Sequence, residues 1–166
     1  MSTRLLRSSI ILLSTLLIAC NDGVPTRPTE PAPPLRGIVF GRQLTATDSA
    51  TVARYGRIVS VVRSDSTMVL LLPTANTQAV VTLPGVVGIC QPLGTSVSTE
   101  IEVELGVGPQ PIDSAVALLT ALGRVHQVDT SIQIVDGVIA ANQLHRLDDY
   151  PILSYVYVVV CPYFLD

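Results

Sequence analysis

Short runs of β-branched and aliphatic residues, separated by turn-forming residues, restrict the fold of this chain more than any other feature. Arg57–Arg63 (RIVSVVR) and Thr67–Leu72 (TMVLLL) flank the sequence SDS, and together they predict a β-hairpin. Gly37–Thr45 and Gln78–Leu83 are two further expected strands, the second of them stopped by Pro84-Gly85. The pattern favours a β-rich fold.

Thr99–Leu105 (TEIEVEL) has the most regular alternation in the chain. One face carries carboxylates, and the other is apolar: Glu100, Glu102 and Glu104 against Ile101, Val103 and Leu105. This is the pattern of a half-buried strand with a wet face. Carboxylates placed together could serve glycoside chemistry or bind calcium. Same-strand neighbours two residues apart are usually a solvent-facing row, which is the interpretation we favour.

One segment has helical spacing. In PIDSAVALLTALG, apolar residues recur at positions i, i+4 and i+7, with Asp113 as the expected cap and Gly123 as the expected end. Asp48–Gly56 (DSATVARYG) allows two interpretations: a short helix capped by Asp48 and ended by Gly56, or a segment that simply leads into the next strand.

Two segments near the C-terminus predict further strands. Asp136-Gly137, between apolar runs, predicts a tight hairpin turn. Ser154–Cys161 (SYVYVVVC) is apolar on both faces, as expected of a central strand. Tyr155, Tyr157 and Tyr163 could line a ligand surface there, although tyrosines packed on a sheet face are the stronger interpretation.

These elements predict a mainly β to α+β fold. We expect a small sandwich or partly open barrel of about seven or eight strands with one helix. Residues 37–166 would form it as a single globular domain, because about 130 residues are enough to bury one core.

The first twenty residues form a separate segment with the features of an export signal. Arg4 and Arg7 precede the apolar stretch Ser8–Ala19. As a helix this stretch would be roughly 18 Å long, which is too short to cross the hydrocarbon core of a membrane, about 30 Å thick. This is the length of a signal-peptide apolar region. Leu17-Ile18-Ala19-Cys20 resembles the lipobox of bacterial lipoproteins. The resemblance implies a signal peptide over residues 1–19 and a lipidated Cys20 as the first mature residue.

A lipid on Cys20 would make the membrane the first partner of this protein, because two or more acyl chains anchor stably. The residue after the cysteine is Asn21 and not Asp, which in the resembled family favours the outer membrane, facing the periplasm, where a cell has one. A secretory signal with a chance cysteine and an uncleaved membrane anchor are the alternatives.

Residues 20–36 are expected to be a lipidated cysteine and a tether. Five of the sixteen residues of Asn21–Arg36 are proline, and proline provides no N–H group for a helix or a sheet. Such a segment is a semi-rigid spacer with a reach of up to ~50 Å.

Composition excludes several functions. All ten basic residues are arginine, which rules out an intact P-loop and Schiff-base lysine chemistry. The formal net charge is −3, and loss of Arg4 and Arg7 would make it −5, so nucleic acid is a poor candidate partner. Tryptophan is absent, which leaves few rings on which sugars or bases could stack.

No motif predicts catalysis, a metal or a cofactor. His126 and His145 are the two histidines, and a metal site could recruit Asp148 or Asp149 beside the second, but a solvated loop is favoured. No G-x-S-x-G motif occurs. We therefore expect a non-catalytic, lipid-anchored envelope protein that binds an unknown ligand or protein or has a structural role. The alternative is a small envelope hydrolase with an unrecognised active site.

Cys90 and Cys161 remain once Cys20 is assigned to lipid. Export places both thiols in an oxidising compartment, which favours a Cys90–Cys161 disulfide over two buried free thiols.

Overall fold

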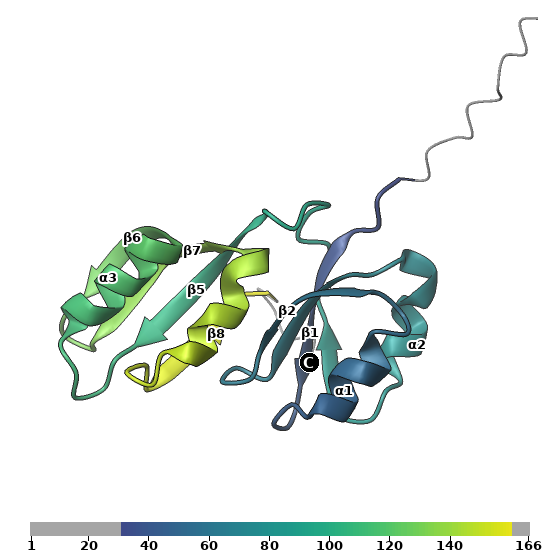
Figure 1. Cartoon of the computed structure of the whole chain (residues 1–166), viewed down its shortest axis with the longest axis horizontal. Helices are drawn as coiled ribbons and strands as arrows, with labels where there is room; N and C mark the ends of the chain where they lie inside the picture. The colour runs from purple at the N-terminus through teal and green to yellow at the C-terminus, as the bar shows by residue number, and fades with distance from the viewer. Residues whose placement is uncertain (1–30, 161–166) are drawn as a thin grey trace, which may run out of the picture. The chain divides into compact units, whose positions relative to one another are not determined.

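Two antiparallel sheets form the described part of the chain (Figure 1). A computed structural model describes residues 31–160, and those from Ala32 onward belong to one compact unit. The elements in chain order are β1 Leu35–Phe40, α1 Ala46–Val52, β2 Arg57–Val62, β3 Thr67–Leu71, the 3-10 helix η1 Thr74–Asn76, α2 Thr77–Val81, β4 Val86–Ile89, β5 Glu100–Gly106, α3 Ile112–Leu122, β6 Gly123–Asp129, β7 Ile134–Ala140, the 3-10 helix η2 Ala141–Asp149 and β8 Tyr155–Val158.

The first sheet, sheet A, has the strand order β2-β3-β1-β4. The predicted hairpin is confirmed, because β2 and β3 pair antiparallel from Arg57↔Leu71 to Val62↔Thr67. The first strand begins at Leu35, two residues before the predicted Gly37, and Leu35 is fully buried. The last two residues of the proline-rich stretch therefore form the start of a strand in sheet A.

Strand β3 is buried along its whole length, which explains its unbroken apolar sequence. Met68 and Leu70 belong to a cluster that includes Val52 of α1 and Val80 of α2. Val69 and Leu71, which alternate with them along β3, belong to a larger cluster that contains apolar side chains of both sheets and of α3. Sheet A is thus covered by its two short helices on one face and packs towards the second sheet on the other.

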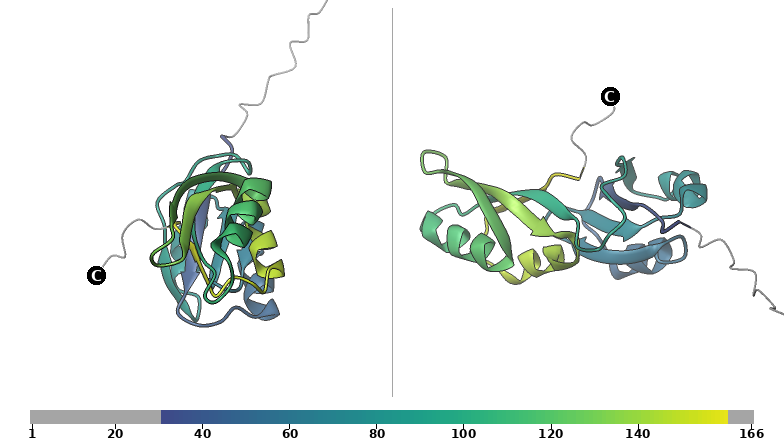
Figure 2. Two further views of the ribbon diagram at one scale, coloured as in Figure 1. Left: turned by 90° about the vertical axis from the view of Figure 1, so that its left-hand side faces the viewer. Right: turned by 90° about the horizontal axis from the view of Figure 1, so that it is seen from above.

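The second sheet, sheet B, has the strand order β6-β7-β5-β8. The predicted alternation of β5 is confirmed: Ile101, Val103 and Leu105 are buried in the larger cluster. Helices α3 and η2 lie on the same side of the sheet, seen in Figure 2. They cover its apolar face with a set of buried side chains: Ala115, Leu118, Leu119, Leu122, Ala141, Leu144 and Leu147.

Helix α3 is confirmed in place, but its ends differ from the prediction. Pro111 is the N-cap, and Asp113 lies in the first turn without a capping hydrogen bond from its side chain. Gly123 ends the helix and is also the first residue of β6, in an extended conformation. The open alternative at residue 48 resolves as the helix α1, where Thr45 is the N-cap and Asp48 completes a capping box.

The strand predicted at Gln78–Leu83 is wrong. Thr77–Val81 is the short helix α2, which follows Pro73 and the 3-10 turn η1. Val80 is buried in the smaller cluster, and Leu83 packs against it from three residues further along. A spacing of three residues is compatible with the helical period of 3.6, and the short apolar run does not distinguish it from a strand.

The hairpin turn predicted at Asp136-Gly137 is also wrong, because both residues lie inside strand β7. The β6–β7 turn is at residues 130–133, where Gln133 has a φ of 60°. Asp129 supports it by accepting hydrogen bonds from Ser131 N at 2.9 Å and Ser131 Oγ at 2.6 Å. Gly137 is required for another reason: an added Cβ would collide with the backbone oxygen of Arg124 in β6 and would lie 2.6 Å from Cδ2 of Leu119 in α3.

The final strand is β8, and it lies at the edge of sheet B, not in its centre. It pairs with β5 alone, from Val103↔Val158 to Gly106↔Tyr155. Val156 and Val158 are buried, whereas Tyr155 is 45% exposed. The apolar run includes Val160, which packs against Gly37 of β1, so packing between sheets accounts for part of its hydrophobicity.

The fold class is as predicted: β-rich, with two four-stranded antiparallel sheets, eight strands in the described residues and few helices, consistent with a sandwich. The short helices α1 and α2 and the 3-10 turns add to the one helix that was expected. No helix within residues 31–160 has the length and apolarity needed to cross a membrane.

Candidate functional site

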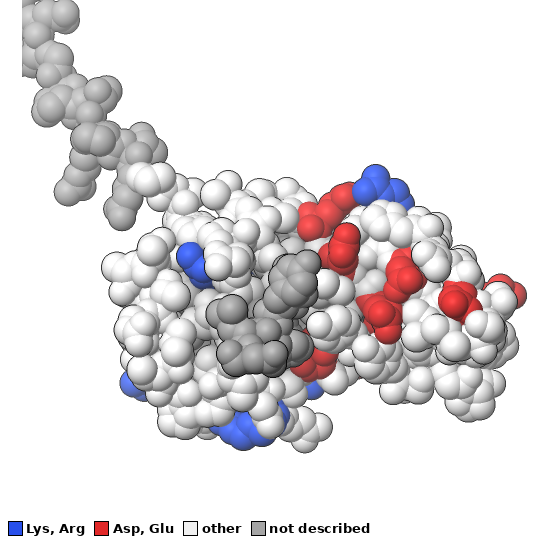
Figure 3. Space-filling view, turned by 180° about the vertical axis from the view of Figure 1, so that it is seen from behind, with Lys and Arg blue, Asp and Glu red and all other residues white. Residues whose placement is uncertain are grey.

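Sheet B leaves one face without a covering helix in the described residues, and this is the outer face, opposite α3 (Figure 2). Directly paired residues of antiparallel strands point to the same side of a sheet. One cross-strand row on the outer face is Asp136–Glu104–Tyr157, and the next is Ile134–Gly106–Tyr155. Acidic side chains gather on the molecular face seen in Figure 3. The predicted solvent-facing row of glutamates therefore belongs to a larger surface.

A hollow of about 440 Å³ lies at one end of this outer face. Gly106 lies between Ile134 and Tyr155, its partners in the same row, and forms the hollow's floor, where an added Cβ would come within 3.1 Å of Tyr155 Cβ. The side chains of Ile132 and Glu104 also line it. The volume lies within the roughly 300–1,000 Å³ range of ligand pockets.

Two stacked tyrosines form one side of the outer face. The ring centroids of Tyr155 and Tyr157 are 6.5 Å apart, with 18° between the ring planes. Burial raises the pKa of the Tyr155 hydroxyl, and the negative charges of Glu104 and Asp65 raise it further. The tyrosine hydroxyl therefore stays neutral, and it lies in a region of negative potential. Tyr163, predicted with these two, lies outside the described residues.

The charges on the outer face are unevenly compensated. Arg124 of β6 forms an ion pair with Glu100 at 2.8 Å, with both side chains more than half exposed. Within residues 31–160 no ion pair involves Glu102, Glu104 or Asp136. Glu104 and Asp136 are direct cross-strand partners, and like charges in that position destabilise a sheet. The end of the face near the hollow therefore carries excess negative charge.

Two aspartates connect the β2–β3 turn to neighbouring elements, Asp65 to strand β8 and Asp148 to helix η2. Asp65 in the turn accepts a hydrogen bond from Val158 N at 3.1 Å, and burial raises its pKa. Asp148 of η2 accepts bonds from Arg63 N at 2.8 Å, Ser64 N at 3.0 Å and Ser64 Oγ at 2.8 Å. Asp148 is therefore held by a turn of sheet A, where it has a structural role.

The histidines are on different elements. His126 lies at the bulge of the edge strand β6, and His145 is an exposed residue of η2 whose backbone N donates to Ser60 Oγ at 2.6 Å. Asp149, the other candidate metal ligand, is exposed. In the described part of the chain, no group of three or more His, Cys, Asp or Glu residues could hold a metal ion.

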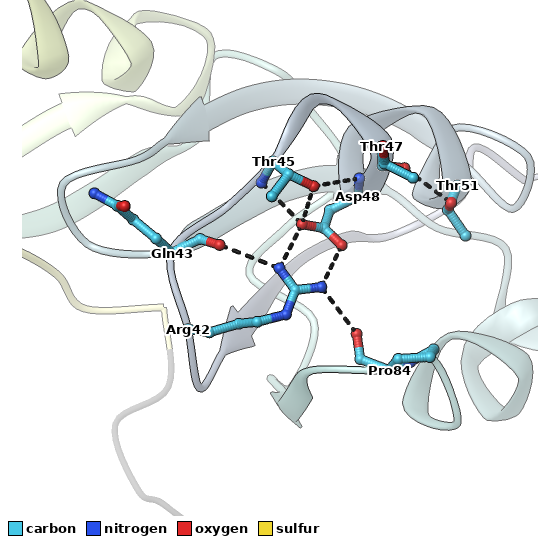
Figure 4. A network of polar contacts seen from close by, with 7 residues as sticks. All are labelled: Arg42, Gln43, Thr45, Thr47, Asp48, Thr51 and Pro84. Carbon is cyan, nitrogen blue, oxygen red and sulfur yellow. Dashed lines mark hydrogen bonds and ion pairs between the residues drawn. The ribbon is translucent and has the colours of Figure 1, made fainter.

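A second, smaller hollow of about 210 Å³ lies at α1, beside the network in Figure 4. Arg42 donates from both terminal nitrogens to Asp48, at 2.7 and 2.6 Å, and Thr45 N donates to the same carboxylate at 2.8 Å. The hydrogen bond from Arg42, followed by that from Thr45, holds the pKa of Asp48 far below its usual range. Further bonds from Arg42 go to backbone carbonyls of Gln43 and Pro84, so this network stabilises the helix start.

The structure describes one of the three cysteines for which the sequence gives predictions. Cys90 is buried and disulfide-bonded. Cys161, its predicted partner, and Cys20, the predicted lipidation site, lie outside the described residues, as do the signal peptide and most of the tether. The Cys90–Cys161 pairing and the lipid on Cys20 remain predictions.

The sequence offered the glutamates and tyrosines as candidates, while favouring a solvent-facing row and tyrosines packed on a sheet face, and it did not predict the hollow. Gly106, Ile134 and Asp136 reach the outer face through strand pairing, and that register cannot be read from the sequence. A glycine at the end of an alternating strand was the available indication, because such a glycine can mark a close approach or a gap.

Comparison with known proteins adds no relative: no protein-family model, no curated protein and no solved structure matches this chain.

Proposed function

We propose that this protein is a lipid-anchored protein of the bacterial envelope whose domain binds a partner protein through the outer face of sheet B. The observation that carries the proposal is the sheet face that no helix covers within residues 31–160, which combines the Tyr155–Tyr157 stack, the hollow at Gly106 and carboxylates without an ion pair in that part of the chain. Exposed tyrosine beside a concave surface is typical of binding sites. The lipobox-like sequence ending at Cys20 and the proline-rich tether support attachment to a membrane.

The domain acts by contact and has no catalysis of its own in this proposal. The hollow has a glycine floor, aliphatic and aromatic walls and the polar residues Gln133 and Ser154, with Glu104 as the carboxyl group among its lining residues. A hollow with one carboxyl group and neither a histidine nor a cysteine among the lining residues that the structure describes suits binding better than catalysis, which needs several convergent reactive groups. No specific observation favours the alternative of an envelope hydrolase.

Affinity isolation of the native lipidated protein from bacterial envelopes tests the proposal. Glu102→Arg places a bulky cation in the outer face, and Ala117→Arg adds the same side chain to the exposed side of α3. Quantitative mass spectrometry should show a partner with the wild type and Ala117→Arg that is lost with Glu102→Arg. Equal recovery with both variants would refute the choice of face.

Anchoring is tested separately by labelled fatty acid. The wild type should incorporate the label and Cys20→Ser should not. Equal labelling of both proteins would end the lipoprotein assignment while leaving the binding face to be judged by the isolation experiment.

A further inference from the structure

We propose that the hollow at Gly106 holds an arginine side chain from an extended, basic segment of the partner protein. This inference rests on the proposed function, since it names the chemistry of the partner that docks on the outer face of sheet B. Three features of the face lead to it.

The first feature is a pair of like charges beside the hollow. Asp136 and Glu104 are directly opposite each other on β7 and β5, and directly paired side chains have Cβ atoms about 4.5–5.5 Å apart. Both residues are half-buried, which strengthens their repulsion relative to bulk water. Arg124, the basic residue of this face, is occupied by Glu100 at the opposite end of β5. A cation from outside would relieve this repulsion.

The second feature is the apolar lining. Ile132, which is 63% exposed, stands with Ile134 and Tyr155 around the glycine floor. A small hydrated metal ion gains nothing from aliphatic walls, whereas an arginine has a long methylene stem and a planar guanidinium that stacks on aromatic rings. The stem fits the walls, and the guanidinium would reach the carboxylate of Glu104.

The third feature is the repeat along β5. Glu104 and Glu102 are two residues apart on one face, a spacing of about 7 Å in a strand. Alternate side chains of an extended peptide have the same repeat, so a segment lying along β5 can present one basic side chain to each glutamate. A monoamine cannot use both carboxylates in this way, whereas a polyamine such as spermidine can and is therefore the rival ligand that the test must exclude.

A binding assay with a defined peptide tests the inference. The full lipidated chain in detergent is titrated with a fluorescent heptapeptide of alternating arginine and threonine, read by polarisation. The same peptide with citrulline for arginine removes charge at constant shape, and spermidine as competitor represents a small amine. The variants are Glu104→Gln, its matched control Glu100→Gln on the same strand, and Ile132→Ser, which removes an apolar wall at constant charge.

The wild type should bind the arginine peptide at least tenfold more tightly than the citrulline peptide. Glu104→Gln should weaken binding tenfold or more, Glu100→Gln less than threefold, and Ile132→Ser severalfold. Without peptide, Glu104→Gln should unfold at a denaturant concentration no lower than the wild type, because it removes one of two opposed charges.

Several results would overturn the inference. Equal weakening by Glu104→Gln and Glu100→Gln would mean diffuse attraction without a site. Spermidine binding as tightly as the peptide, with the same dependence on Glu104, would mean a small-amine pocket. Failure of the arginine peptide to bind would also refute it, and the proposed function would stand if Glu102→Arg still abolished partner recovery from envelopes.

Discussion

Replacement of Gly137 by alanine tests the packing of α3 on sheet B. An added Cβ at residue 137 would lie 2.6 Å from Cδ2 of Leu119 and still closer to the backbone oxygen of Arg124 in β6. The leucine can rotate, but the strand backbone cannot, so the overpacking should cost about 2–3 kcal/mol. Reduced freedom of the unfolded chain returns about 0.4–1 kcal/mol. The net loss should be about 1–2.6 kcal/mol from a total stability of about 5–15 kcal/mol.

The assay is urea unfolding of the chain followed by circular dichroism, with Gly88→Ala as the matched control. Gly88 is also a strand glycine, in β4, but an added Cβ there meets no atom within 4 Å. Gly88→Ala should therefore be neutral or stabilising by up to about 1 kcal/mol. If Gly137→Ala were as stable as Gly88→Ala, residue 137 could not lie beneath α3, and the continuous strand β7 would be wrong.

Three further predictions concern hydrogen bonds, pH and the disulfide. Asp148→Ala removes three hydrogen bonds to the β2–β3 turn and should lower the free energy of unfolding in urea by about 1–2 kcal/mol, a moderate amount because the site is partly open to water. The control Asp149→Ala, at an exposed neighbouring residue, should change the stability little. The lowered pKa of Asp48 stabilises the fold above the unfolded value of about 3.9, and this contribution is lost as the pH falls from there towards the lower folded value. The stability difference between wild type and Asp48→Asn should accordingly be largest near neutral pH and shrink below about pH 4; a pH-independent difference would contradict the Arg42–Asp48 assignment. Cys90 and Cys161 should resist alkylation in denatured, non-reduced protein from the envelope, and modification of both would exclude the bond.

The sequence predicts those elements in which burial of one face gives the apolar residues a regular spacing. The alternation of β5 follows from its wet and buried sides, and the β2–β3 hairpin follows from two apolar runs around SDS. Each is a local pattern that tertiary packing reinforces. The start of α1 was left open, although Thr45 and Asp48 have the spacing of a capping box.

The wrong predictions concern segments whose structure is determined by tertiary contacts. Val80 and Leu83 face the core of sheet A with helical spacing, but in so short a run they resemble a strand. Gly137 resembles a turn residue, yet the close approach of the Arg124 backbone oxygen in β6, together with Leu119 of α3, explains it. The edge position of β8 and the hollow at Gly106 depend on strand order and register, which no local pattern in this chain encodes.

Photo-crosslinking in intact cells tests the central claim most directly, that the outer face of sheet B is the binding surface. A photoreactive amino acid is placed at residue 102 or 157 on that face, or at residue 117 on the exposed side of α3. Irradiation should yield the same covalent partner adduct from residues 102 and 157, with none from residue 117. Adducts from residue 117 alone, or none from either position on sheet B, would contradict the account.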